Sequence, residues 1–113
     1  MEPVKGGALA NPIPKVRAIF DAANPEVSYA SWAICYAASL DGIITVLSGM
    51  SNLEQMDDNL SYMKEFKPLN EQELQVIHQA QEAMNEDKSI PCTACHYCTD
   101  RCHINIPIPE FFP

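Results

Sequence analysis

Four of the five cysteines in this 113-residue chain lie within eleven residues, at Cys92, Cys95, Cys98 and Cys102. Their spacing, C-x2-C-x2-C-x3-C, lets one short loop present several thiolates to the corners of a compact iron–sulfur cubane. Zinc usually takes two C-x2-C pairs separated by a longer loop, and disulfides between cysteines this close would constrain the unfolded chain little. The spacing therefore predicts a [4Fe–4S] cluster, with zinc and free thiols as the alternatives.

The fourth cysteine and two histidines are the other candidate ligands of this segment. In two-cluster ferredoxins the last cysteine of such a run binds the other cluster. Because this chain has a single run, we expect Cys102 to bind the same cluster as the first three, and an open or externally supplied corner is the alternative. His103 stands where ferredoxins typically have proline, and we expect both His103 and His96 to face solvent rather than to bind the metal.

The residues before the cysteine run have the pattern of amphipathic helices. Apolar spacing predicts one helix over residues 15–23 and another, apolar almost all round, over 25–40, with Asn24 as its N-cap. Two further helices are expected after Ser51 and Asn70, because each is followed by a glutamate three residues later, the signature of a capping box.

Residues 43–47 (Ile-Ile-Thr-Val-Leu) form a continuous apolar run, typical of a strand buried on both faces of a parallel sheet. Residues 1–4 have the pattern of the end of a second strand. Two parallel strands leave both sheet edges unpaired. The sequence therefore predicts a mostly helical α/β chain that is the closing part of a larger structure. Cys35, inside the predicted helix 25–40, is expected to be a core residue.

The composition of the chain limits the classes of partner that it is expected to bind. The chain has a formal charge of -8 at pH 7 and is 47% hydrophobic. This balance counts against nucleic acid or an anionic membrane as partner, since both attract clustered positive charge. No run approaches the roughly 20 apolar residues of a membrane span, and residues 1–7 lack the features of a secretory signal. We expect the chain to be cytoplasmic.

Taken together, residues 1–110 resemble the C-terminal part of an aldo-keto reductase, of the subgroup that carries a ferredoxin-type 4Fe–4S segment after its barrel. Four stretches carry the resemblance: MEPVKGG at 1–7, the helix at 32–40, ITVLSGMSNLEQMDDN at 44–59, and the cysteine run. The resemblance implies the C-terminal slice of a (β/α)8 barrel, with one or two parallel strands and their helices, followed by an irregular iron–sulfur loop segment. The implied parts are a barrel portion over 1–69, a C-terminal helix over 70–88, and the 4Fe–4S segment over 89–113.

That family binds NADP(H) at the C-terminal ends of its barrel strands, where barrel sites generally lie. The resemblance implies that residues 2–7 follow the cofactor pyrophosphate and that the turn before the third helix faces the 2′-phosphate. The implied nucleotide-binding residues are Gly6, Gly7, Gly49, Met50, Ser51, Asn52, Gln55, Asp58 and Asn59. Many members have Lys and Arg where this chain has Gly49 and Gln55, so the choice between NADP and NAD stays open.

The catalytic Asp, Tyr, Lys and His of that family lie on its earlier strands and have no counterpart here. The resemblance therefore predicts cluster binding and electron transfer as the C-terminal part of an aldo-keto reductase-like oxidoreductase. The expected partner is the missing barrel portion or a redox partner protein. The alternatives are an autonomous ferredoxin-like electron carrier or docking module, and a truncated chain with no independent activity.

Overall fold

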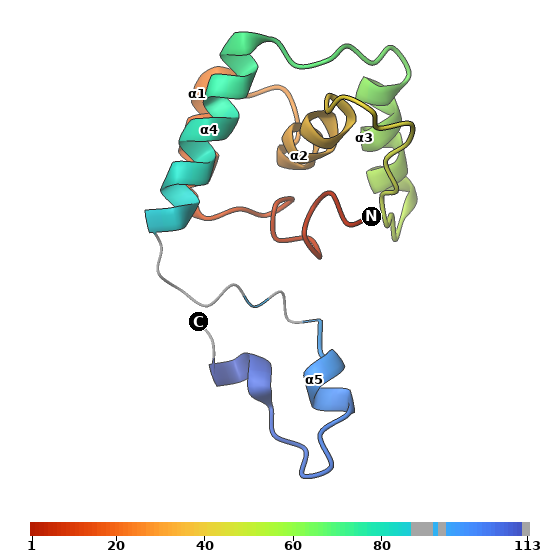
Figure 1. Ribbon diagram of the computed structural model, residues 1–113, viewed down its shortest axis with the longest axis vertical. Helices are drawn as coiled ribbons and strands as arrows, with labels where there is room; N and C mark the ends of the chain where they lie inside the picture. Colours follow the sequence, from red (N-terminus) through yellow and green to blue (C-terminus); the bar gives the residue numbers. More distant parts are fainter. Residues whose placement is uncertain (87–91, 93–94, 112–113) are drawn as a thin grey trace.

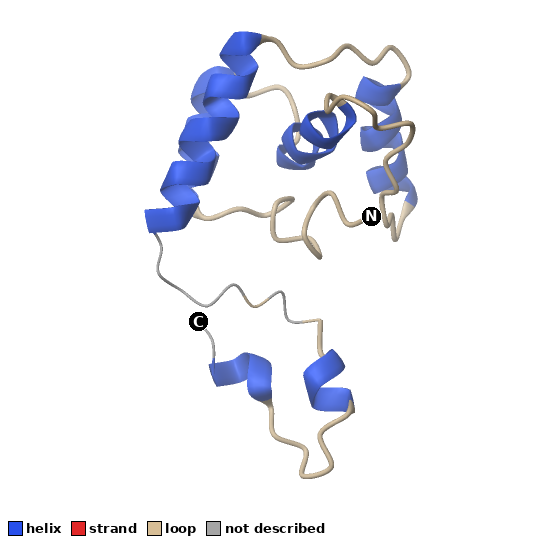
Figure 2. Cartoon of the chain, in the orientation of Figure 1, coloured by secondary structure: helices blue, strands red, loops and turns tan. Residues whose placement is uncertain are grey.

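The structure, a computed structural model, describes residues 1–86, 92 and 95–111. Its helices are α1 (Pro14–Ala23), α2 (Tyr29–Ala38), α3 (Leu53–Met63), α4 (Glu71–Glu86), α5 (Tyr97–Asp100) and the 3-10 helix η1 (Ile108–Phe111) (Figure 1). The described residues contain no strand (Figure 2). The predicted mostly helical character is thus confirmed. Among the described helices, none combines the length and the apolar character that crossing a membrane requires.

Helices α1 and α4 lie side by side and supply most of the core (Figure 1). The core residues are Val16, Phe20, Trp32, Ile77, Ala80 and Ala83. Lys15 and Glu86 form an ion pair that also joins the two helices. Because both of these side chains are mainly exposed, the pair contributes at most about 1 kcal/mol. Apolar packing therefore holds α1 against α4.

Helix α2 joins this core through Trp32. The rings of Phe20 and Trp32 are stacked, with centroids 5.1 Å apart and an interplanar angle of 9°. Only 6% of Trp32 is exposed, and its Nε1 has no hydrogen-bond partner in the described part of the chain. A buried N–H without an acceptor is unfavourable, so apolar packing alone holds this indole in place.

Helix α2 begins at Tyr29, later than the sequence predicts. Asn24 is the C-cap residue of α1, and its Oδ1 accepts a hydrogen bond from the Glu26 N–H at 3.1 Å. The N-cap of α2 is Ser28, whose Oγ accepts from the Ser31 N–H at 3.2 Å. The predicted start at residue 25 is wrong because Asn24 closes the turn between the helices, while Ser28, also a favoured N-cap type, caps α2.

The two predicted capping boxes differ in outcome. The Glu73 N–H donates to Asn70 Oδ1 at 3.0 Å, and the Asn70 N–H donates to Glu73 Oε2 at 2.8 Å, which confirms the box at the start of α4. At α3 the N-cap is Asn52, one residue later than predicted. Its Oδ1 accepts from the Gln55 N–H at 2.9 Å, and the Ser51 N–H donates to Gln55 Oε1 at 2.7 Å.

The predicted strands do not form in the described residues. Ile44 is 99% exposed and Leu47 55% exposed, so the run at 43–47 is neither part of a strand nor buried. Residues 3–10 form turns, and Glu2 has a φ of 56°, which corrects the strand end predicted at 1–4. The physical reason is that a strand needs a neighbour to bond its N–H and C=O groups, and the described residues supply none.

Helix α3 leaves its apolar stripe in solvent. Leu53 is 76% exposed, Met56 42% and Leu60 55%. A polar contact ties α3 to the rest of the fold: the Ser28 hydroxyl donates to Asp58 Oδ2 at 2.7 Å. Most of the apolar stripe of α3 is therefore uncovered within the described part of the chain.

The double role of Ser28 leads to a stability prediction. Ser28→Ala removes both the N-cap of α2 and the hydrogen bond to Asp58, and we expect it to lower the free energy of unfolding by about 1–2 kcal/mol. Urea denaturation followed by circular dichroism measures this change. Ser28→Thr keeps a hydroxyl and is expected to lose less than about 0.5 kcal/mol. Equal denaturation midpoints for the Ala and Thr variants would contradict the assigned role.

The cysteine segment contains two short elements, α5 and η1, which pack against each other. Helix α5 lies inside the cysteine run and carries Cys98. The predicted domain boundary between residues 88 and 89 falls outside the described residues, as do Thr93 and Ala94 of the run. The predicted division at that point stays a prediction.

Candidate functional site

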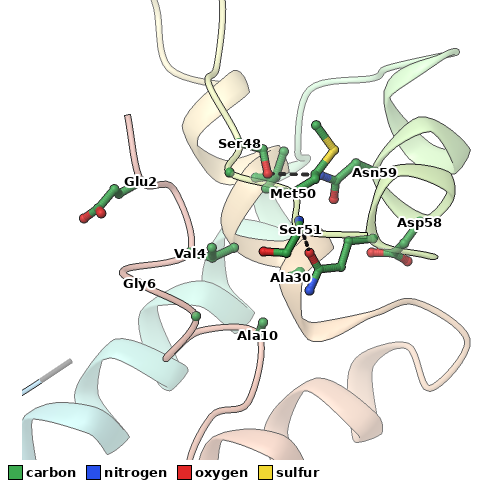
Figure 3. A pocket seen from close by; sticks show the side chains of 14 residues that line it. Glu2, Val4, Gly6, Ala10, Ala30, Ser48, Met50, Ser51, Asp58 and Asn59 are labelled. Atoms are coloured by element: carbon green, nitrogen blue, oxygen red, sulfur yellow. Dashed lines mark hydrogen bonds between the residues drawn. The ribbon is translucent and has the colours of Figure 1, made fainter. Parts of the chain in front are cut away.

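A pocket of about 380 Å³ opens between the N-terminal turns, α2 and the start of α3 (Figure 3). Of the residues predicted to bind a nucleotide, its lining contains Gly6, Gly7, Gly49, Met50, Ser51, Gln55, Asp58 and Asn59. Asn52 lines an adjoining hollow that shares Gln55 and Asp58 with the pocket. The structure thus brings together two segments about forty residues apart in the sequence, and their role toward a nucleotide stays a prediction.

The N-terminal wall of the pocket is a glycine turn. Gly6 and Gly7 have φ values of 63° and 94°, in the left-handed region that glycine adopts without strain. The turn is held by hydrogen bonds from the Gly7 N–H to the Val4 carbonyl at 3.1 Å and from the Lys5 N–H to the Glu2 carbonyl at 3.1 Å. Main chain without side chains therefore borders the pocket at Gly6 and Gly7, which permits close approach of a ligand.

The opposite wall is the turn before α3, which is held by side-chain hydrogen bonds. Asn59 Nδ2 donates to Ser48 Oγ at 3.0 Å, and the Ser51 N–H donates to Gln55 Oε1 (Figure 3). The Tyr62 hydroxyl donates to Asn59 Oδ1. Burial first, and the Asp58 carboxylate second, raise the pKa of Tyr62. This phenol therefore stays protonated and keeps donating to Asn59.

Carboxylates dominate the charge of the pocket. Glu2 and Asp58 lie on opposite sides of it (Figure 3). Among the described residues that line it there is no Lys, Arg or His. The Ser28 hydroxyl donates to Asp58 Oδ2 and so fixes the orientation of this carboxylate at the pocket wall.

Part of the lining was not predicted from the sequence. Ala30 and Ile34 of α2 form part of the wall, and Ile34 is only 2% exposed. Nothing local in the sequence marks these two residues, because packing against α3 and the N-terminal turns places them there. Ser48 also lines the pocket, and its place beside the predicted Gly49 is the signal that points to it.

The cysteines of the run are free and do not form a closed site. Cys92, Cys95 and Cys98 are exposed, and Cys102 is partly buried. Within residues 1–86, 92 and 95–111, no three His, Cys, Asp or Glu side chains are placed so that they could hold a metal ion. The predicted cluster ligands therefore stay a prediction.

Cys102 is set apart by its backbone neighbours. The Ile106 N–H donates to Cys102 Sγ at 3.5 Å. The N–H groups of Ile106 and Ile104, and to a smaller extent that of Asn105, lower the pKa of Cys102 although partial burial acts in the opposite direction. Hydrogen bonds of this kind favour the thiolate, the form in which cysteine binds metals.

The fifth cysteine has different surroundings. Cys35 is partly buried and lines a hollow that also contains Trp32 and Tyr62. Burial first, and the Glu73 carboxylate second, raise the pKa of Cys35. A protonated thiol in a helix that joins the core fits the packing role predicted for Cys35.

Comparison with known protein families gives a match for the helical part of the chain. Residues 13–82 match the family described as Aldo/keto reductase family. The matched region contains almost all of α1–α4, including the α2 and α3 sides of the pocket, whereas the cysteine run lies beyond it. No curated protein and no solved structure matches the chain.

Proposed function

The chain belongs to the aldo/keto reductase family, and on that premise we propose that it forms the C-terminal, nucleotide-binding part of an oxidoreductase. The observation that carries the proposal is the pocket lined by Gly6, Gly7 and the 49–59 segment. The resemblance to aldo-keto reductases independently implies that both segments bind a nicotinamide cofactor, NADP or NAD.

The pocket offers suitable groups to a dinucleotide. The bare backbone at Gly6 and Gly7 admits the pyrophosphate closely. Val4 and Ala30 supply apolar surface, which suits the adenine ring. Asp58 and Asn59 supply oriented polar groups, which suit the ribose. This division of apolar walls and few fixed polar groups is common in cofactor sites.

Hydride transfer needs residues beyond this chain, because the catalytic Asp, Tyr, Lys and His of the family have no counterpart here. The exposed run at 43–47, with Ile43 48% and Ile44 99% exposed, supports a missing partner. We therefore propose that the remaining barrel portion pairs with this run and completes the active site. The alternative hypothesis, a self-sufficient electron carrier, does not explain why this apolar segment is uncovered.

For the cysteine segment we propose a [4Fe–4S] cluster held by Cys92, Cys95, Cys98 and Cys102. The donor set fits: four thiols in ferredoxin spacing, one of which, Cys102, has its pKa lowered by backbone N–H groups. Binding requires the four thiols to close from their separate positions. When bound, the cluster supplies one-electron transfer between the reductase and a redox partner protein. The decisive measurement is the iron and labile sulfide content of protein prepared without oxygen.

The nucleotide proposal is tested by titrating the full 113-residue chain with AMP, which needs only the adenosine end of the site. We expect a dissociation constant on the order of 1 mM, with shifts of the backbone amide NMR signals of Gly6, Gly7, Gly49 and Ser51. Binding is weak because the rest of the barrel is missing. The absence of shifts at about ten times that AMP concentration would overturn the proposal.

Two glycine variants make this test specific. Gly7 and Gly42 both have positive φ, 94° and 80°, and a Cβ at either meets nothing within 4 Å. Valine is therefore strained to a similar degree at both positions, but only Gly7 lines the pocket. We expect Gly7→Val to weaken AMP binding at least about fivefold, and Gly42→Val to leave it unchanged.

A further inference from the structure

We propose that this pocket selects a nucleotide with a free ribose 2′-hydroxyl, NAD rather than NADP, because its charges repel a 2′-phosphate. The inference rests on the proposed function and adds to it the identity of the cofactor. Three observations support it: the charges that line the pocket and the adjoining hollow, the negative charge balance at the N-terminus of α3, and the orientation of Asp58.

Carboxylates line both the pocket and the adjoining hollow. Glu2 and Asp58 line the pocket, and Asp21, Glu54 and Asp58 line the adjoining hollow. None of the described residues that line either of them is Lys, Arg or His. A phosphate monoester carries a charge of about -1.5 to -2 at pH 7. A site for such a group beside Asp58 needs cations or unpaired donors, and the lining there supplies the opposite charge.

The cations nearest in the sequence point elsewhere. Lys5 lies in the same turn as Gly6 but lines a different pocket, the apolar one between α1, α2 and α4. Arg17 donates to the Asn11 side chain and, at 2.6 Å, to the Pro12 carbonyl. Neither side chain therefore neutralises a 2′-phosphate placed beside Asp58.

The N-terminus of α3 does not offset the negative charge of these carboxylates. A helix N-terminus acts as about half a positive charge and so favours anions. Here the first turn already holds a full negative charge on Glu54, and the Asn52 side chain takes the Gln55 N–H. The charge balance at this helix end is therefore negative.

Asp58 has the chemistry that recognises a ribose diol. The Ser28 hydroxyl donates to Oδ2 at 2.7 Å, which orients the carboxylate and uses one of its roughly four acceptor positions. The remaining positions can accept hydrogen bonds from ribose hydroxyls, as acidic residues do in NAD-binding sites. The same carboxylate that accepts from a 2′-hydroxyl repels a 2′-phosphate.

The test compares AMP with adenosine 2′,5′-bisphosphate on the full chain by the same NMR titration. The two ligands share adenine and the 5′-phosphate and differ at the 2′ position. We expect AMP to bind about tenfold more tightly at low ionic strength, and the ratio to fall as salt screens the carboxylates.

A positive charge placed in the pocket should remove the preference for AMP over the bisphosphate. Gly49 lines the pocket and has no positive φ, and a Cβ there meets nothing within 4 Å, so the Cβ that Gly49→Lys adds meets no steric conflict. We expect the ratio in Gly49→Lys to fall below about threefold or to reverse. Gln79→Lys is the matched control, because it makes the same change in net charge at an exposed position of α4 outside the pocket. It should keep the tenfold ratio.

Each outcome decides a distinct point. Equal or tighter binding of the bisphosphate by the unmodified chain overturns the selection of NAD but still supports nucleotide binding at the pocket. Binding of neither ligand overturns the proposed function and this inference with it. Equal loss of preference in Gly49→Lys and Gln79→Lys would assign the repulsion to the whole chain and overturn the role of the pocket.

Discussion

Cys95→Ala is expected to abolish cluster binding almost completely. Prepared without oxygen, the unmodified chain should contain about four iron and four labile sulfide per molecule, and the variant less than about one of each. The reason is that one thiolate fewer leaves a corner of the cubane without its ligand, and the segment has no fifth cysteine to replace Cys95. Colorimetric iron and sulfide assays on the same samples measure both values.

Two further variants sharpen this prediction. Cys35→Ala also removes one thiol, but from the partly buried site on α2, and it should keep the full iron and sulfide content. Cys102→Ala asks whether the fourth cysteine serves the same cluster: a loss equal to that in Cys95→Ala assigns it as a ligand, while retention of four iron indicates an external ligand. One zinc without sulfide in the unmodified chain would contradict the cluster and favour the zinc alternative.

Spacing alone predicts the donors of this site but not their arrangement. The segment has few interactions of its own, because α5 and η1 are four residues each and bury no side chain. Tyr97 is 75% exposed and Ile104 64% exposed. Contacts this sparse cannot fix the sulfur positions, and for such sites metal binding itself supplies the free energy of ordering.

The helices were predictable where local signals agreed and less so where they competed. Asn70 and Glu73 form the expected capping box because no other N-cap residue stands nearby. At α2, Asn24 and Ser28 are both good caps, and only the structure shows that Asn24 closes a turn. The run at 43–47 has a clear strand pattern, yet strand formation depends on a neighbouring strand, which no local pattern in this chain provides.

For the pocket, too, the sequence predicts the residues that are close together in the chain better than those that packing brings together. Gly49, Ser51 and Gln55 lie in one continuous segment, so their grouping follows directly from the sequence. The position of Gly6 and Gly7 opposite them was implied by the resemblance to aldo-keto reductases. The α2 residues of the wall were missed because helix packing, not sequence proximity, brings them to the pocket.

Trp32→Ala should have the largest effect on stability. It removes the indole that stacks on Phe20 and connects α2 to the α1–α4 pair. Loss of a buried aromatic side chain costs about 3–5 kcal/mol. Chains of this size are stabilised by only about 5–15 kcal/mol in total. We therefore expect a large drop of the urea midpoint and a substantially unfolded protein at 37 °C, measured by far-UV circular dichroism because the only tryptophan is lost.

Trp32→Phe separates packing from the unpaired N–H. Phenylalanine keeps a ring against Phe20 and deletes the buried Nε1 donor that has no partner in the described part of the chain. Removal of this donor offsets part of the lost apolar contact, by about 1–3 kcal/mol. We therefore expect Trp32→Phe to lose less than half of what Trp32→Ala loses. If both variants unfold at the midpoint of the unmodified chain, the stacked pair does not hold α2 to the core; if both lose the same amount, the indole N–H has an acceptor in solution.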